Sequence, residues 1–257
     1  MIRVKILTNI YHIVFFEGDK SIYVFFKGCN FTCKGCILKI SPWDCHLPAN
    51  LQSKLRGFSA SKTLSEVELS AIVENFRVKK AVLGGGEPTI DEKLVDIVKL
   101  LNDHDVYTIL LTNGHNLDAN MVQCLEKAGL NEVCVSIKAI TDSIHTYYTG
   151  KSNQRLLKNF KLLNNCRIRL RAESILIPNL IDVDEIERIA KFIASLNPTI
   201  PYRIDAYIQV PGTPWPAASL KKIQEAVEIA QEYLENVSYL YADVPIVGEV
   251  KLVYPKI

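Results

Sequence analysis

The chain has 257 residues, of which 48% are hydrophobic and 23% are charged, and its formal net charge is +2. These proportions exclude an intrinsically disordered chain, and the near-neutral charge gives no support for nucleic-acid binding by bulk electrostatics. Its apolar runs are too short to cross a bilayer, and charged and polar residues interrupt the first 16 residues, which makes them a poor signal peptide. We therefore expect a cytoplasmic protein without a membrane partner.

Strand-like and helix-like segments alternate along the chain without a Ser-rich or Pro-rich linker, which predicts an α/β fold. Apolar residues at helical spacing predict helices over 90–101, 183–196 and 220–234, and Thr89 with Glu92 predicts a capping box before the first of them. Strands are expected at 21–26, from Ala81 into a glycine-rich turn, and at 106–112, 132–138, 166–177 and 202–210. Together these segments make about six strand–helix units.

Three cysteines, Cys29, Cys33 and Cys36, share one short loop directly after the first of these strands. Zinc sites usually take four protein ligands and disulfides take an even number of cysteines, so a trio favours an iron–sulfur cubane with one iron left open. An open iron can bind a substrate or cofactor. The clustering favours metal chemistry in a reducing compartment over disulfides.

A second motif, Gly84-Gly85-Gly86-Glu87-Pro88, ends the strand that starts at Ala81. Glycines allow the backbone to approach a ligand closely and to adopt positive φ. A carboxylate beside them can accept hydrogen bonds from an ammonium group. The motif therefore predicts a ligand-binding loop next to the cysteines.

The C-x3-C-x2-C spacing and the Gly-Gly-Glu-Pro loop together resemble the radical S-adenosylmethionine (SAM) superfamily. The resemblance implies that Cys29, Cys33 and Cys36 hold a catalytic [4Fe-4S] cluster, whose open iron chelates SAM. It also implies that Gly84, Gly85, Gly86 and Glu87 hold the methionine end of SAM. One electron then cleaves SAM to methionine and a 5′-deoxyadenosyl radical, which abstracts hydrogen from a substrate. A one-electron donor such as a ferredoxin or flavodoxin is implied as a partner.

Most of the chain is similar to activating enzymes of the pyruvate formate-lyase type. The similarity is carried by 24–29, Trp43, 85–88, Thr112-Asn113-Gly114 and 136–138. It implies a partial (βα)6 TIM-like barrel over residues 1–257, which form a single radical SAM core domain with short N- and C-terminal extensions. It also implies a site for SAM near Lys138. The further residues expected to contact SAM or substrate are Ser136, Arg171, Tyr207 and Gln209.

Three departures from that family bear on the substrate and on the cofactor pocket. The Asp-Gly-Pro-Gly stretch expected before the first cysteine is replaced by Phe16-Glu17-Gly18-Asp19-Lys20, which disfavours a glycyl loop as substrate. The aromatic residue usual before the third cysteine is replaced by Gly35, which changes how the adenine side of the pocket is closed. The acids of a monovalent-cation site are also replaced, by Leu111 and Ser136.

Polar residues alternate with apolar ones along the later strands and are expected to face the barrel interior. One such face carries Arg167, Arg169, Arg171 and Glu173, and another carries Arg203, Asp205, Tyr207 and Gln209. They could form interior ion pairs, or the excess of cations, with Lys138 included, could face a carboxylate or phosphate of the substrate.

Three functional hypotheses stay open at this point. The substrate is a small anionic molecule or an RNA in a closed cationic pocket, or it is a glycyl-radical protein whose peptide loop enters an open groove. A non-catalytic iron–sulfur electron-transfer protein is the alternative from a different class. Three further residues each have alternative roles. Cys45 is either a fourth ligand, part of a second site or a structural thiol. His46 either contacts substrate or lies in a surface loop, and Trp215 is either a lid over the pocket or an anchor of its loop.

Overall fold

The computed structural model describes residues 7–55, 63–241 and 246–256. One sheet runs through it in the order β8-β7-β6-β5-β4-β3-β2-β1-β9. Its strands are β1 Ile10–Phe16, β2 Ser21–Phe26, β3 Lys80–Gly85, β4 Tyr107–Thr112, β5 Glu132–Ser136, β6 Arg169–Leu176, β7 Tyr202–Ala206, β8 Val237–Leu240 and β9 Val250–Tyr254. The α-helices are α1 Ala49–Leu55, α2 Glu66–Phe76, α3 Leu94–Asp103, α4 Ala119–Ala128, α5 Asp142–Thr149, α6 Gln154–Leu163, α7 Val183–Ala194 and α8 Leu220–Gln231, and the 3-10 helices are η1 Ile37–Lys39 and η2 Pro88–Ile90.

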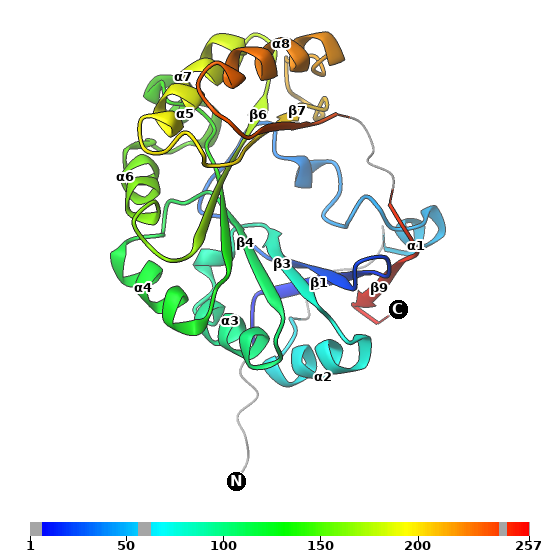
Figure 1. Cartoon of the computed structure of the whole chain (residues 1–257). Coiled ribbons are helices and arrows are strands. Elements are labelled where there is room, and N and C mark those ends of the chain that lie inside the picture. The colour runs from blue at the N-terminus through cyan, green and yellow to red at the C-terminus, as the bar shows by residue number, and fades with distance from the viewer. Residues whose placement is uncertain (1–6, 56–62, 242–245, 257) are drawn as a thin grey trace.

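The strands from β2 to β8 run parallel to one another in chain order. Strand β1 pairs antiparallel with both β2 and β9. The sheet of the described residues therefore starts at β8 and ends at β9 without closing, and it curves into a barrel-like wall (Figure 1). The predicted α/β fold is confirmed: β2 to β7 are the six expected strands, and β1, β8 and β9 extend the sheet at its edges.

The helices α2 to α8 cover the outer face of this wall (Figure 1). Their apolar stripes pack against alternate strand residues, so that Ile186, Ile189 and Ile193 of α7 are fully buried. The capping box predicted at Thr89 and Glu92 is wrong. Helix α3 begins only at Leu94, without a side-chain cap, and the Thr89 hydroxyl donates to Glu87 Oε1 instead.

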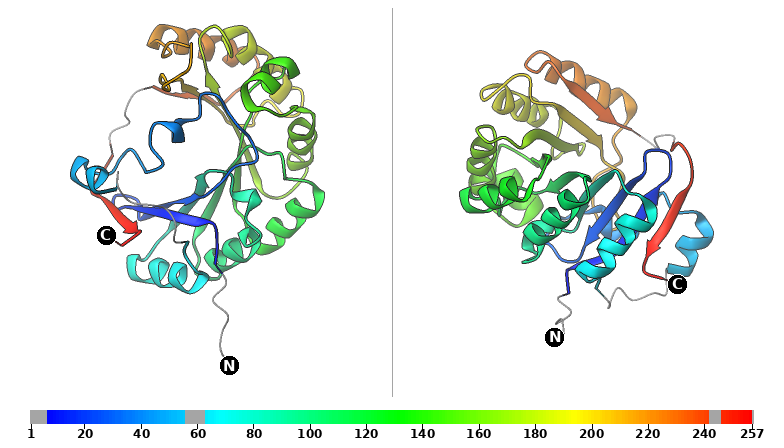
Figure 2. Two further views of the ribbon diagram at one scale, coloured as in Figure 1. Left: turned by 180° about the vertical axis from the view of Figure 1, so that it is seen from behind. Right: turned by 60° about the horizontal axis from the view of Figure 1, so that its bottom comes forward.

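The segment from η1 to α1 lies on the open side of the sheet, and β9 lies beside β1, as Figure 2 shows from two further directions. This segment covers the inner face of β1, β2 and β9 with a small second core, which includes Tyr11, Phe25, Trp43, Leu47 and Leu55. No helix in the described ranges is both long and apolar enough to span a membrane.

A buried histidine, His12, joins this second core to the C-terminal strand. Its Nε2 accepts a hydrogen bond from the Asp44 backbone N–H at 3.2 Å, so Nδ1 carries the proton and donates to the Tyr254 carbonyl at 2.9 Å. Burial lowers the pKa of His12 from 6.5 to about 4. A second proton would be placed against the Asp44 N–H, and the folded state therefore keeps this imidazole neutral.

This arrangement predicts acid sensitivity of the fold. Because the pKa of His12 is lower in the folded than in the unfolded chain, only the unfolded chain gains its proton between pH 6.5 and about 4. The free energy of unfolding should fall by about 3 kcal/mol as the pH drops through that window. Urea unfolding of cluster-free protein measures this, and His12→Gln, which cannot titrate, should show a shallower fall. Equal slopes in the two proteins would contradict the prediction.

Candidate cluster and cofactor site

The motifs found in the sequence meet at one edge of the sheet, where the parallel strands end. The cysteine loop follows β2, the glycine loop 84–88 ends β3, Thr112-Asn113-Gly114 ends β4, and Lys138 follows β5. The carboxyl ends of barrel strands are where such folds place their active sites. The structure therefore brings most of the predicted site residues together.

The cysteine loop is fixed to the end of α5 by its backbone. The N–H of Thr32 donates to the Thr149 carbonyl at 2.8 Å, and the N–H of Lys34 donates to the Tyr148 carbonyl at 2.9 Å. Cys33 lies between these two anchors, so its position is set by the protein.

The three thiols of this loop are free, with Cys29 exposed and Cys33 and Cys36 half-buried. Burial raises the pKa of the Cys33 thiol to about 11, the Lys138 ammonium opposes this rise, and charges on Cys36 and Cys29 add to it. Burial also raises the pKa of Cys29. Three unpaired thiols on one anchored loop, two of them in surroundings that disfavour a free thiolate, fit a cationic iron–sulfur cluster as their ligand partner.

The glycine loop is joined to the cysteine loop by two backbone hydrogen bonds. Gly86 N–H donates to the Phe26 carbonyl and Glu87 N–H donates to the Gly28 carbonyl, both at 2.9 Å. A Cβ at Gly86 would lie 2.0 Å from the Gly28 oxygen and 2.6 Å from that of Phe26, so only glycine allows this approach. The two motifs are thus one rigid unit.

The Glu87 carboxylate is buried and already accepts four hydrogen bonds. Its Oε1 accepts from Thr89 N–H at 3.1 Å, the Thr89 hydroxyl at 2.6 Å and the Thr112 hydroxyl at 2.7 Å, and its Oε2 accepts from Asn113 N–H at 2.7 Å. Burial raises the pKa of Glu87, and these donors oppose the rise. The sequence favoured this carboxylate as the acceptor for an ammonium group. In the structure it ties β3 to β4, and its predicted contact with SAM stays a prediction.

Asn113 belongs to the site but was not among its predicted residues. Its Nδ2 donates to Asn30 Oδ1 at 2.6 Å and lies 3.8 Å from Cys29 Sγ, while its backbone N–H donates to Glu87. It therefore connects the cysteine and glycine loops. The Thr-Asn-Gly triplet marked this position only by resemblance, because no spacing in the sequence shows which loop the amide reaches.

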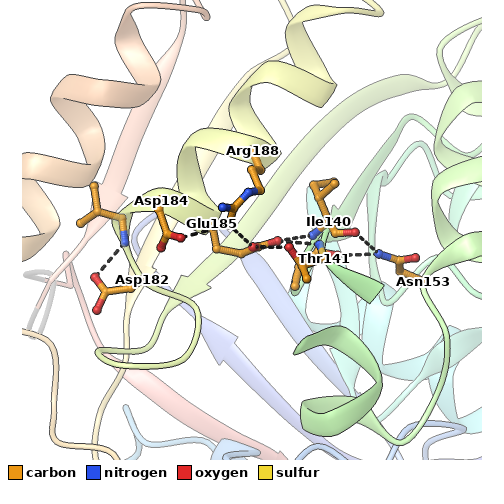
Figure 3. A network of polar contacts seen from close by, with 9 residues as sticks. Ile140, Thr141, Asn153, Asp182, Asp184, Glu185 and Arg188 are labelled. Atoms are coloured by element: carbon orange, nitrogen blue, oxygen red, sulfur yellow. Dashed lines mark hydrogen bonds and ion pairs between the residues drawn. The ribbon is translucent and has the colours of Figure 1, made fainter. Parts of the chain in front are cut away.

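Lys138 and Ser136 lie at the exit of β5, where the Lys138 ammonium donates to the Ser136 hydroxyl at 2.5 Å. The turn that follows is held by Glu185 of α7, which is fully buried. Its carboxylate accepts from Ile140 N–H at 2.6 Å and Thr141 N–H at 2.7 Å, and Arg188 pairs with it at 2.8 Å (Figure 3). This network fixes the backbone just beyond Lys138.

The inward-facing arginines are paired with carboxylates, as one of the two sequence interpretations expected. Arg171 contacts Glu132 at 2.9 Å, with Arg169 at 3.7 Å from the same residue, and Arg203 contacts Asp205 at 2.7 Å and Glu173 at 2.8 Å. The excess of cations expected from the sequence was counted without Glu132.

One of the cations in that excess is misassigned. Arg167 is exposed and precedes β6, so its assignment to that strand face is wrong. The Arg171 guanidinium pairs with Glu132 at the start of β5, and its predicted contact with SAM stays a prediction. In the described part of the chain, Lys138 is the inward-facing cation of the predicted set without an ion-paired carboxylate.

The Tyr207 ring packs against the cysteine loop at Gly35. It is 1% exposed, its hydroxyl accepts from Val210 N–H at 3.1 Å and bonds Thr213 Oγ1 at 2.6 Å, and its ring would lie 2.9 Å from a Cβ at Gly35. Trp215 is buried against the same ring, with centroids 6.3 Å apart, and therefore anchors the loop. Gln209 is exposed beyond the end of β7. The contacts predicted for Tyr207 and Gln209 stay predictions.

Cys45 and His46 lie beside β1, outside the loop that carries the trio. The His46 ring contacts Phe16, at the end of β1 that pairs with Ser21, whereas the cysteine loop follows Phe26 at the other end of the β1–β2 pair. The Asp44 backbone, directly before Cys45, contacts His12, which pairs with Phe25, so this segment runs beside β1 from His12 toward Phe16. This placement does not support Cys45 as a fourth ligand of the same cluster.

Comparison with known proteins agrees with this geometry. The family model described as the radical SAM superfamily matches residues 23–193. A curated relative from Methanocaldococcus jannaschii, named provisionally as a glycyl-radical enzyme activating enzyme, is 33% identical over 216 residues, which cover 82% of this chain and 77% of the relative.

Two solved structures show the fold. Streptococcus suis SuiB bound to S-adenosylmethionine matches with a TM-score of 0.64 and 15% identity, over 82% of this chain and 47% of SuiB. A domain of a pyruvate-formate lyase-activating enzyme from Bacteroides vulgatus matches with a TM-score of 0.54 and 20% identity, over 62% of this chain and 96% of that domain. The chain thus spans about half the length of SuiB, and the expected partial barrel is confirmed.

Proposed function

Because this chain belongs to the radical SAM superfamily, we propose that it generates a radical on a partner protein, as an activating enzyme for a glycyl-radical enzyme. The chain is a radical SAM enzyme, and its cofactors are a [4Fe-4S] cluster and SAM. When bound, these groups supply an electron and a 5′-deoxyadenosyl radical that removes hydrogen from the substrate. The chain itself positions the groups and excludes water.

Specific residues would carry these positioning tasks. Cys29, Cys33 and Cys36 would hold the cluster on their anchored loop, and the backbone of the glycine loop would orient the methionine end of SAM. Lys138 would hold the SAM carboxylate, because its ammonium acts on Cys33 electrostatically and makes no direct ion pair with a carboxylate in the described ranges. We also propose that residues 1–257 form one core, which the match over 23–193 and the continuous sheet support.

The ion pairs of the inner arginines support a protein substrate rather than a small anion or an RNA. A phosphate or polyanion needs unpaired cations, but Arg171 and Arg203 are neutralised by Glu132, Glu173 and Asp205. If Lys138 holds SAM, no further inward cation of the predicted set serves a substrate anion. The activating-enzyme relative, which aligns with 82% of the chain, supports the same choice.

Deuterium transfer tests this proposal. Cluster-loaded enzyme, SAM and a strong one-electron reductant are incubated anaerobically with extract from cells grown on α-deuterated glycine. Mass spectrometry of 5′-deoxyadenosine should find deuterium with the protein fraction, and protease treatment of that fraction should remove the signal. Stimulation by the low-mass or RNA fraction, without deuterium from the protein fraction, would contradict a protein substrate. Cys33→Ala gives the background in every arm.

A further inference from the structure

We propose that Asp44, Cys45 and His46 form a second metal site, which binds a borderline divalent cation such as Zn²⁺. One ligand atom of each residue lies within 4.8 Å of those of the other two. His46 Nδ1 is 2.9 Å from Asp44 Oδ1 and 3.8 Å from Cys45 Sγ. Asp44 is buried, whereas Cys45 and His46 are exposed, so the group opens to solvent on one side.

The donor set matches the chemistry of zinc. Thiolate, imidazole and carboxylate bind Zn²⁺ at about 2.0 to 2.3 Å, which places tetrahedral donors roughly 3.3 to 3.7 Å apart. The two observed separations fall on either side of that range and need only small side-chain adjustments. Three protein ligands leave a fourth position for water or another small ligand, which is the pattern of an exchangeable site.

The turn that carries the donors is already fixed by its surroundings. The Gln52 amide donates to the carbonyls of Cys45 at 2.9 Å and Leu47 at 2.7 Å. The backbone N–H of Asp44 donates to buried His12, and the backbone N–H of His46 donates to Asp44 Oδ1 at 2.8 Å. Outer contacts of this kind hold metal ligands in place and raise affinity. The donors therefore meet without a change of backbone.

The site is separate from the cluster in both position and composition. It lies beside β1 between His12 and Phe16, on the open side of the sheet, whereas the cysteine loop follows β2 beyond Phe26. Its three donors come from consecutive residues, so it requires nothing from Cys29, Cys33 or Cys36. Its occupancy can therefore be measured without SAM chemistry.

Cobalt titration tests the proposal in a full-length chain that carries Cys29→Ser, Cys33→Ser and Cys36→Ser. One equivalent of Co²⁺ should give thiolate charge-transfer absorption and the visible bands of tetrahedral cobalt, and Zn²⁺ should displace it. Adding Cys45→Ser should remove the thiolate absorption and weaken binding by at least about tenfold. Adding Cys166→Ser, a half-buried thiol elsewhere, is the matched control and should change neither.

A second measurement applies if the variant with the three serine substitutions does not fold. Cluster-loaded wild-type protein is dialysed against Zn²⁺, and zinc per chain is compared with that of cluster-loaded His46→Gln. The variant should lose one zinc and keep its iron. Equal zinc in both proteins, no thiolate absorption in the titration, or absorption that survives Cys45→Ser would overturn the proposal and leave Asp44 and His46 as an ion pair.

Discussion

Cys33→Ala is expected to abolish cluster assembly and to reduce SAM cleavage to the uncatalysed background. Cys33 lies between the two backbone anchors at Thr32 and Lys34, so the loop cannot shift to bring another thiol into its place. A cluster held by only two cysteines should be lost during preparation. Iron and sulfide analysis after anaerobic reconstitution measures the first effect, and chromatography of 5′-deoxyadenosine measures the second.

Cys45→Ala is the matched control for this variant. Cys45 follows the trio closely in sequence, but it groups with Asp44 and His46 beside β1 and lies outside the anchored loop of the trio, so its loss should leave cluster iron and SAM cleavage at wild-type levels. Loss of cluster iron in Cys45→Ala would show that Cys45 is a ligand after all. A full cluster in Cys33→Ala would disprove the assignment of the trio.

Local patterns predicted the elements of this fold well, because each depends on residues close in sequence. Period-two and helical spacing located β2 to β7 and the helices α3, α7 and α8. The cysteine and glycine motifs were also visible, since each lies in one short stretch. The predicted start of the first helix failed because Thr89 bonds the Glu87 carboxylate, which a local capping pattern cannot distinguish from a helix cap.

Features that depend on pairing between distant segments could not be predicted. Arg171 and Glu132 meet because β5 and β6 pair with Glu132 opposite Arg169, a register that no local pattern fixes. The excess of cations expected from the sequence was overestimated, because Glu132 was left out and Arg167 was counted on the inner face. The position of Cys45 likewise depends on the path of the chain around β1.

Glu87→Ala should destabilise the fold by about 3 kcal/mol or more, even in cluster-free protein without SAM. The substitution removes the common acceptor of four hydrogen bonds, and the N–H groups of Thr89 and Asn113 then have no partner in a buried place. The hydroxyls of Thr89 and Thr112 can rotate to other acceptors, which limits the loss. Urea unfolding measures the effect as a lower midpoint with an unchanged slope.

The two roles considered for Glu87 give opposite results in a pair of measurements. If the carboxylate mainly bound the SAM ammonium, Glu87→Ala would weaken SAM binding to the cluster-loaded enzyme and leave the unfolding free energy unchanged. The structure instead predicts a loss of stability, which Thr112→Val should reproduce in part, at about 1 kcal/mol, because it removes one of the four donors. Because the same carboxylate holds Asn113 beside Cys29, destabilised Glu87→Ala should also retain its cluster less well.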